Sequence, residues 1–303
     1  MRSLDGSQDR AGGGQVDETG LESLKSKVSA IIAAVSGSAT EAEADRIVAG
    51  AMASRGADPE ALGLGWALKR AQGAPLGLAM GRQPFLGITL AAREDVLAPR
   101  EETELLGREA LALLKQWASQ DPDRPLRIID MGCGAGNLTC ALAVAVPQAR
   151  IWASDLTASC AALTRENVAL HRLQDRVQVS QGDLFAPLAD QDLEATMDLV
   201  VMNPPYIPST SLEKSHAQLL EHEPREAFDG GPYGVSILTR LLQEAPAFLK
   251  PGGHLLFEFG LGQARIIRLL AERKPGYGEI RFAENGRGEP RVGILEKLGT
   301  PPE

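Results

Sequence analysis

The chain has 303 residues, which is enough for one large domain or for one large and one small domain. Its apolar fraction of 44% and its charged fraction of 23% are ordinary for a soluble globular protein. The formal net charge of -9 disfavours loose binding to the phosphate backbone of nucleic acids.

The cysteines and the apolar runs indicate the compartment. Cys133, Cys140 and Cys160 are an odd number without paired spacing, which fits a reducing environment better than a disulfide scaffold. No run reaches the roughly 18 apolar residues of a membrane span, and the amino terminus has no signal-peptide core. We therefore expect a cytoplasmic protein that contacts no membrane.

The first quarter of the chain predicts a leader followed by a small helical domain. Residues 1–20 are rich in Gly, Asp and Gln with almost nothing apolar, so we expect them to be disordered. Residues 21–83 carry apolar residues at helical spacing, and Thr40-Glu41-Ala42-Glu43 is a capping-box sequence. The expected helices lie at residues 21–35, 47–52 and 66–71.

A linker and an α/β domain are predicted next. Short, alternating, Pro-punctuated runs at residues 84–100 predict a hairpin linker. Over residues 101–303, strand and helix patterns alternate, which predicts a mainly parallel sheet covered on both faces. The expected strands lie at residues 127–130, 150–155, 177–180, 197–202, 253–259, 279–283 and 291–296. The expected helices lie at residues 103–117, 137–146, 158–170, 238–249 and 262–274.

A glycine-rich loop, Asp130-Met131-Gly132-Cys133-Gly134-Ala135-Gly136, follows the first strand of this domain. Ligands of such sheets bind beyond the carboxyl ends of the strands, and glycines let the backbone approach them closely. Residue 137 is Asn where the dinucleotide fingerprint needs Gly. The acidic strand end favours S-adenosylmethionine (SAM), whose sulfonium and amino group are cationic, over a pyrophosphate.

Two further strand ends add polar residues at the same edge. Asp155 can accept hydrogen bonds from both ribose hydroxyls, and Asp183 is placed to accept from the adenine amine, with Leu184 or Phe185 against the ring. Three such features on successive strands disfavour a generic glycine-rich turn. The residues predicted to contact SAM, or its product S-adenosylhomocysteine, are Thr103, Asp130, Gly132, Gly134, Gly136, Asp155, Leu156, Asp183, Leu184 and Asn203.

The tetrapeptide Asn203-Pro204-Pro205-Tyr206 directly follows the apolar strand at residues 197–202. Its prolines stiffen the backbone. The Asn203 oxygen and the Pro204 carbonyl can accept the two N–H groups of an amide or amine and aim its nitrogen at the methyl group. Tyr206 is expected to pack on the planar group. We predict all four residues to bind substrate, with Asn203, Pro204 and Tyr206 as the catalytic residues.

Neither a strong general base nor a metal ion is expected. The sulfonium is already a good leaving group, so in-line positioning does most of the work. His216, His222 and His254 are scattered, and no carboxylates are arranged around them as metal ligands. Glu289-Pro290-Arg291 either borders the site or forms a surface turn. The glycine loop and the tetrapeptide together predict a SAM-dependent N-methyltransferase.

A series of segments in chain order resembles the release factor glutamine methyltransferase family (HemK/PrmC-like). They are residues 73–75, 81, 85–87, 96–105, 130–136, 155, 182–185, 203–208, 223–231 and 249–253, within a resemblance covering about residues 40–296. The resemblance implies a helical substrate-recognition domain, a β-hairpin linker and a class I SAM-dependent methyltransferase domain. That domain is Rossmann-like, with a seven-stranded mainly parallel sheet whose last strand is antiparallel.

The resemblance also implies the substrate, which is the glutamine side chain in the Gly-Gly-Gln loop of bacterial class I release factors. Asn203 and Pro204 would hold that amide. The expected partner is a release factor, with no direct contact to nucleic acid.

Three alternatives stay open. The first is N-methylation of a small metabolite (an amine, amide or guanidine), because Ala98 and Glu101 depart from the family's linker signature. The second is methylation of an exocyclic base amine, which would need a basic recognition region and is disfavoured by the net charge. The third is a silent module that keeps SAM as a structural ligand, against which the intact Asn203, Pro204 and Tyr206 argue.

Overall fold

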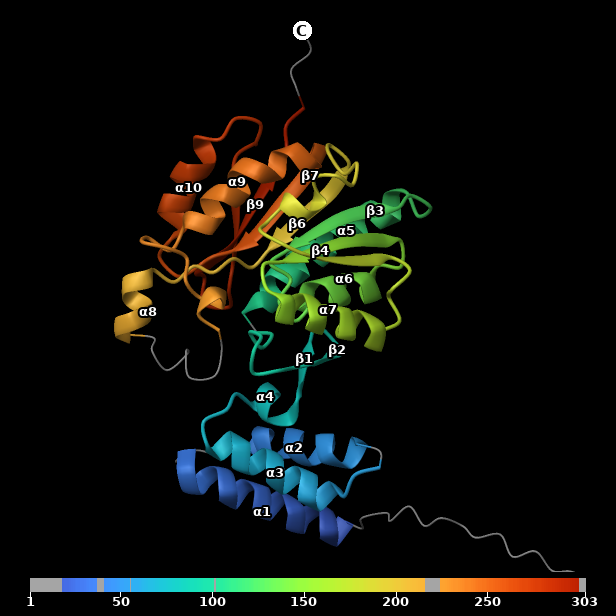
Figure 1. Cartoon of the computed structure of the whole chain (residues 1–303), viewed down its shortest axis with the longest axis vertical. Coiled ribbons are helices and arrows are strands. Elements are labelled where there is room, and N and C mark those ends of the chain that lie inside the picture. The colour runs from blue at the N-terminus through green and yellow to red at the C-terminus, as the bar shows by residue number, and fades with distance from the viewer. Residues whose placement is uncertain (1–17, 37–40, 55, 101, 216–223, 300–303) are drawn as a thin grey trace, which may run out of the picture. The chain divides into compact units, whose positions relative to one another are not determined.

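The computed structural model describes residues 18–36, 41–54, 56–100, 102–215 and 224–299. The chain divides into two compact units, one ending at Met80 and the other beginning at Gly81 (Figure 1). Of the predicted leader, only residues 18–20 are described, and they belong to the first helix instead. Four residues used above lie outside the described residues: Thr40, Glu101, His216 and His222.

The first unit is helical. Its helices are α1 (Glu18–Ser36), α2 (Glu41–Ala53), α3 (Pro59–Ala71) and α4 (Leu76–Met80). Their apolar faces meet in one core that includes Val28 and Ile47. Helix α3 begins well before the predicted start because the Asp58 side chain accepts a hydrogen bond from the Glu60 backbone N–H at 3.1 Å. Pro59 occupies the first turn, where its missing N–H costs no helical hydrogen bond.

The second unit begins with a hairpin that is shorter than the one predicted. Strands β1 (Arg82–Phe85) and β2 (Ile88–Ala91) pair antiparallel around Leu86 and Gly87, whose φ angles of +44° and +83° suit a two-residue turn. Residues 96–100, predicted as part of the hairpin, form no strand. Val96 instead packs in a small core with Leu163.

A seven-stranded sheet follows, with the strand order β5-β4-β3-β6-β7-β9-β8. The strands are β3 (Leu126–Met131), β4 (Ala149–Asp155), β5 (Val177–Gln181), β6 (Met197–Met202), β7 (Leu249–Glu258), β8 (Arg281–Glu284) and β9 (Pro290–Glu296). Strands β5, β4, β3, β6 and β7 pair in parallel, and β9 pairs antiparallel with β7 and β8. The predicted fold class, including the antiparallel last strand, is confirmed.

Helices cover both faces of the sheet (Figure 1). Helices α5 (Thr103–Gln120), α6 (Asn137–Ala145) and α7 (Ala158–Leu170) enclose the core that contains Ile128 and Leu199. Helices α9 (Ser236–Phe248) and α10 (Ala264–Glu272) enclose the other core, with Ile129 and Val200. Neighbouring residues face opposite cores because side chains alternate along a strand. The short helix α8 (Ser209–Ser215) was not predicted.

The topology decides where a ligand can bind. Strand β3 lies between β4 and β6, so the chain leaves β3 toward one edge and later returns to its other side. The carboxyl ends of β3 and β6 therefore form the switch point at which ligands of open α/β sheets bind. Asp130 lies at the end of β3, and Asn203 directly follows β6. Within the described ranges, no helix is both long and apolar enough to cross a membrane.

Candidate active site

The loop after β3 has a backbone that its glycines permit. Gly132, Gly134 and Gly136 have φ angles of +65°, +56° and +76°, in the left-handed region. Gly136 forms the amino-terminal cap of α6, and a Cβ atom there would lie 2.9 Å from the Thr164 side chain. Gly136 thus lets α6 pass close to α7, whereas Gly132 and Gly134 border a cavity.

This cavity, called the cofactor cavity here, has a volume of about 340 Å³. It brings together most of the residues predicted to contact SAM: Gly132, Gly134, Asp155, Leu156, Asp183, Leu184 and Asn203. A smaller space of about 40 Å³ shares Gly132, Gly134 and Asn203 with it and adds Asp130 and Thr103. Pro205, predicted to bind substrate, lines the cofactor cavity.

Asp155 is already engaged by its own chain. One carboxylate oxygen accepts from the Gly134 backbone N–H at 2.9 Å. The other accepts from the backbone N–H and the hydroxyl of Thr157, at 3.0 and 3.2 Å. A carboxylate offers about four acceptor positions. Asp155 also lines the cofactor cavity, where its predicted partners are the ribose hydroxyls.

Asp130 is a buried carboxyl group with one occupied oxygen. Its Oδ2 accepts from the Thr139 backbone N–H at 2.9 Å and from the Thr139 hydroxyl at 2.5 Å. Its Oδ1 has no hydrogen-bond partner within the described part of the chain. Burial, with a smaller contribution from the charge of Asp155, raises the pKa of Asp130 to about 7. A cationic group bound beside Oδ1 would therefore stabilise the ionised form of Asp130.

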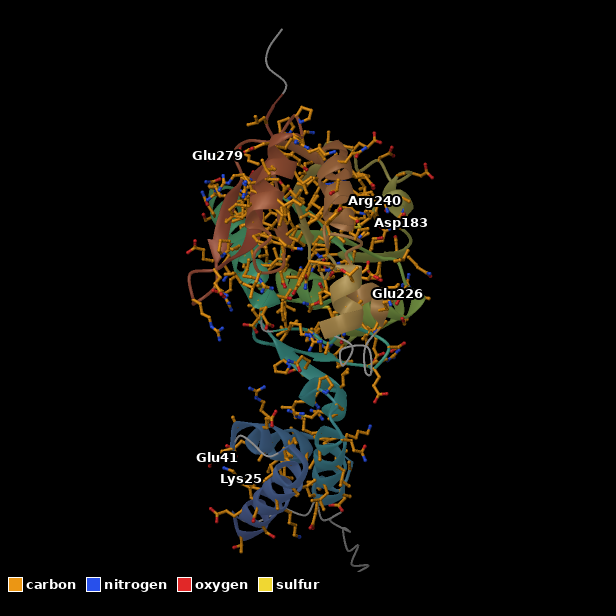
Figure 2. The ribbon with its side chains drawn as sticks, turned by 90° about the vertical axis from the view of Figure 1, so that its left-hand side faces the viewer. Lys25, Glu41, Asp183, Glu226, Arg240 and Glu279 are labelled. Atoms are coloured by element: carbon orange, nitrogen blue, oxygen red, sulfur yellow. The ribbon has the colours of Figure 1, made fainter. Side chains whose placement is uncertain are left out.

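Asp183 is partly occupied as well. Its Oδ1 accepts from the Arg240 guanidinium at 2.9 Å, and both side chains lie at the surface (Figure 2). This ion pair comes from α9, on the face of the sheet that Leu184 and Phe185 help to cover. Sequence reasoning did not identify Arg240 as a neighbour of the predicted adenine site.

A second cavity, called the acceptor cavity here, has a volume of about 330 Å³. It is lined by Leu97, Arg100, Glu102, Asn203, Pro204, Tyr206, Ile207, Ala227, Phe228 and Glu258. Leu97, Asn203 and Ala227 also line the cofactor cavity. The two cavities therefore meet at Asn203, with Pro204 and Tyr206 on the acceptor side.

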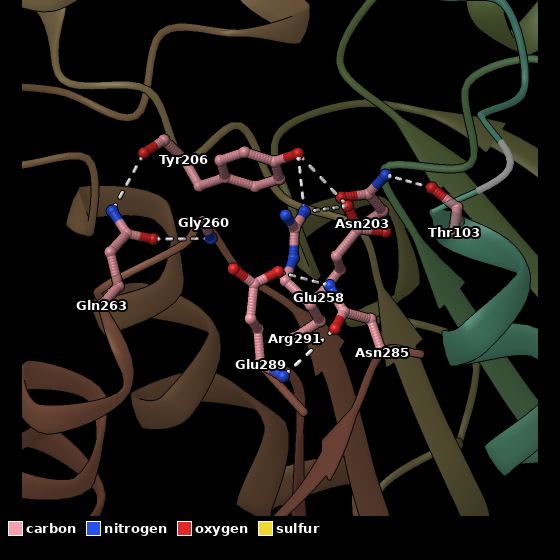
Figure 3. Close-up of polar contacts among 9 residues, drawn as sticks. All are labelled: Thr103, Asn203, Tyr206, Glu258, Gly260, Gln263, Asn285, Glu289 and Arg291. Atoms are coloured by element: carbon pink, nitrogen blue, oxygen red, sulfur yellow. Dashed lines mark hydrogen bonds and ion pairs between the residues drawn. The ribbon is translucent and has the colours of Figure 1, made fainter. Parts of the chain in front are cut away.

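The orientation of Asn203 is set by a residue on another element (Figure 3). Its Nδ2 donates to the Thr103 hydroxyl at 2.9 Å, which leaves Oδ1 as an acceptor for another group. Thr103 begins α5 and is only 1% exposed. Thr103 was predicted to contact the cofactor, and the structure places it directly behind Asn203.

Sequence reasoning missed Glu258, which lies beneath Tyr206 (Figure 3). The Tyr206 hydroxyl donates to Glu258 Oε1 at 3.2 Å, and Arg291 Nη2 donates to both at 3.3 Å. Burial raises the pKa of Tyr206 to about 12, so its phenol stays protonated as a donor. Arg291 thus borders the site and is not in a simple surface turn. The sequence did contain a signal for Glu258, because it is an acidic residue at the end of the apolar run that forms β7.

A glycine-containing loop supports the tetrapeptide from behind. A Cβ atom at Gly230 would lie 2.7 Å from the Pro205 carbonyl oxygen, and one at Gly234 would lie 2.3 Å from that of Tyr206. Gln263 also donates to the Tyr206 carbonyl at 3.0 Å (Figure 3). Only glycine permits this close approach, so the loop fixes the backbone that presents Asn203.

Comparison with known proteins gives a consistent result. Residues 110–259 match the family model of the methyltransferase small domain. The release factor glutamine methyltransferase of Geobacter sulfurreducens is 35% identical over 228 residues, covering 75% of each chain. That of Moorella thermoacetica is 36% identical over 235 residues, covering 77% of this chain and 79% of that protein.

Among solved structures, the fold is similar to the hMettl16 catalytic domain in complex with MAT2A 3'UTR hairpin 6. The TM-score is 0.54 at 16% identity, over 78% of this chain and 83% of that chain. That likeness concerns the fold alone. The sequence identity to the two curated relatives, over three quarters of the chain, shows that this chain belongs to the release factor glutamine methyltransferase family.

Proposed function

We propose that this enzyme transfers a methyl group from SAM to the side-chain amide nitrogen of the glutamine in the Gly-Gly-Gln motif of a peptide chain release factor. Family membership supports the substrate. The observation that carries the proposal is the meeting of two cavities at Asn203. An acceptor in one cavity and a methyl donor in the other would therefore both lie beside Asn203.

The residues of the cofactor cavity fit SAM, which supplies a methyl group on a cationic sulfonium. The unpartnered Oδ1 of Asp130 suits a cationic group, since an ionised carboxylate gains from an opposite charge. The Asp155 carboxylate, which lines this cavity, suits the ribose hydroxyls. Leu156 and Leu184 provide apolar surface for the adenine ring, with the Asp183 carboxylate as its polar neighbour.

The tetrapeptide then holds the acceptor. The Oδ1 of Asn203 and the backbone carbonyl of Pro204 accept the two N–H groups of the glutamine amide. Thr103 keeps the Asn203 amide from rotating, so the acceptor oxygen is oriented before the substrate binds. Preorganised acceptors of this kind lower the barrier because no reorientation is needed during the reaction.

The two units suggest a division of labour. We assign the methyltransferase reaction to residues 101–303, which supply most of the lining of both cavities. We assign recognition of the release factor to the helical region over residues 21–83, with residues 84–100 as the linker. Release factors act in the cytoplasm, and the reaction is placed there.

The test is methyl transfer from labelled SAM to a purified bacterial release factor. A release factor whose Gly-Gly-Gln glutamine is replaced serves as the matched control. We expect label on the intact protein and none on the control. Equal labelling of both would assign transfer to another residue. Label on neither, with SAM binding confirmed by calorimetry, would contradict the release factor as substrate and favour a small-molecule acceptor.

A further inference from the structure

Glu258 is a buried carboxyl group with unused acceptor capacity. It ends β7 and is 1% exposed, yet it borders the acceptor cavity together with Asn203, Pro204 and Tyr206. Its Oε1 accepts from Tyr206 and Arg291, whereas its Oε2 has no hydrogen-bond partner of ordinary geometry among the residues described. A buried oxygen without a partner reduces stability, so its retention calls for an explanation in function.

The proposed reaction needs a destination for a proton. A C–N bond forms to the amide nitrogen, the C–S bond of the sulfonium breaks, and its electron pair stays on sulfur. The amide nitrogen begins with two N–H bonds and ends with one. Because a nitrogen-protonated amide is a very strong acid, that proton leaves as the C–N bond forms. Asn203 Oδ1 and the Pro204 carbonyl can orient the N–H bonds, but amide oxygens are far too weak as bases to keep the proton.

The groups around the acceptor cavity narrow the choice of base. Tyr206 keeps its own proton because its pKa is raised to about 12. The Arg100 guanidinium carries hydrogen-bond donors only, so it cannot accept a proton. Among the described residues that line this cavity, two carboxylates remain, Glu258 and Glu102, and Glu102 is exposed at the start of α5. Glu258 is shielded from water and lies directly beneath the Tyr206 ring.

We propose that Glu258 is a further catalytic residue, which contacts the acceptor amide through Oε2 and takes the proton that the nitrogen loses. This inference rests on the proposed function. One N–H is held by Asn203, and the second, oriented by the Pro204 carbonyl, passes its proton to Glu258 as the nitrogen becomes tetrahedral. The carboxylic acid then returns the proton to water once the methylated product has left the cavity.

The surroundings of Glu258 suit this task. Burial raises its pKa, while the Thr103 hydroxyl, the charge of Arg291 and the Tyr206 hydroxyl favour the ionised form, and Glu102 favours the neutral form. A base is most effective when its pKa lies near the working pH. Since the base must be ionised, activity falls as the pH drops through this pKa, above the ordinary glutamate value of 4.5.

The test compares pH profiles of kcat at saturating SAM and release factor, so that titration of the free cofactor site does not contribute. We expect E258Q to lower kcat by about 10²–10⁴-fold and to lose the acidic limb of the profile. SAM affinity, and release factor affinity measured with S-adenosylhomocysteine bound, should change by only a few fold. E296Q, which removes an exposed carboxylate from the neighbouring strand β9, is the matched control and should behave as the wild type.

Wild-type kcat in E258Q, or an acidic limb that survives in it, would overturn the inference, and so would loss of the limb in E102Q alone. If E258Q does not fold, E258D decides: it should keep the limb at a reduced kcat, and an unchanged kcat would count against the role. Absence of transfer by the wild type would instead contradict the proposed function.

Discussion

At the scale of single residues, Asp130 is buried and has an oxygen without a hydrogen-bond partner among the described residues. It lines the smaller space next to the cofactor cavity, together with Thr103 and Gly132. With a pKa raised to about 7, it is half neutral near physiological pH. A cationic ligand beside Oδ1 favours the ionised form, so binding releases a proton from the neutral fraction. Cofactor affinity should therefore depend on pH.

We expect SAM binding to weaken as the pH falls below about 7, by at most about tenfold per pH unit. Calorimetry at several pH values, in buffers with different ionisation enthalpies, measures both the affinity and the released proton. D130N should bind SAM more weakly and lose this dependence. The difference between the two proteins is the relevant quantity, because the α-amino group of SAM titrates near pH 8 itself. An identical pH slope in D130N would contradict the assignment.

At the scale of elements, the site depends on the pairing of β7 with β9. Gly293 of β9 lies opposite Phe257 of β7 and Phe282 of β8. A Cβ atom at Gly293 would lie 2.5 Å from the Phe257 ring, which is fully buried. Because Glu258 directly follows Phe257 and Arg291 lies two residues before Gly293, this contact sets the position of the ion pair beneath Tyr206.

We expect G293A to destabilise the protein by about 1–3 kcal/mol, since a filled core must shift to admit the methyl group. Urea unfolding of the full chain measures this change, and kcat should fall as Glu258 moves with β7. G278A is the control, because a Cβ atom there meets its nearest neighbour at an ordinary 3.6 Å. Equal stability of G293A and the wild type would show that β7 and β9 can separate without cost.

At the scale of the whole molecule, a charge cluster around the buried Asp198 joins the central strands at the end of the sheet opposite the site. Asp198 of β6 accepts from Arg124 at 2.6 Å and from the Arg127 backbone N–H of β3 at 2.8 Å, and it pairs with Lys250 of β7. Burial opposes its ionisation, but these partners outweigh it and hold the pKa of Asp198 below the usual 3.8. This cluster links three neighbouring strands.

A lowered pKa in the folded state fixes the sign of the pH effect. The contribution of Asp198 is fully present above its unfolded pKa and is lost as the pH falls through the folded one. We expect D198N to be less stable than the wild type at pH 7, with the difference shrinking below about pH 4. Denaturant unfolding at pH 7 and below about pH 4 measures this difference in stability. The substitution of the exposed Asp123→Asn serves as the control. A difference that does not vary with pH would exclude the charge as its cause.

Prediction from sequence succeeded where a signal lies within one short segment. Helix α7 and strand β6 have the predicted bounds because their apolar spacing is uninterrupted. The predicted helix α3 was too short because Gly63 and Gly65 weaken its helical pattern. The predicted hairpin was too long because Val96 is buried against Leu163 and does not belong to a strand. Local sequence patterns indicate that a residue is buried, but they do not indicate which part of the chain it packs against.

The sequence by itself determined the glycine loop, the tetrapeptide and the alternation of strands and helices along the chain, because each depends on neighbours in the chain. Only the tertiary structure decided what stands behind Asn203 and Tyr206. Thr103 lies 100 residues from Asn203, and Arg291 lies 85 residues from Tyr206. These contacts form because the carboxyl ends of β6 and β7 lie next to the first turn of α5 in the folded protein. No spacing of residues along the chain encodes that arrangement.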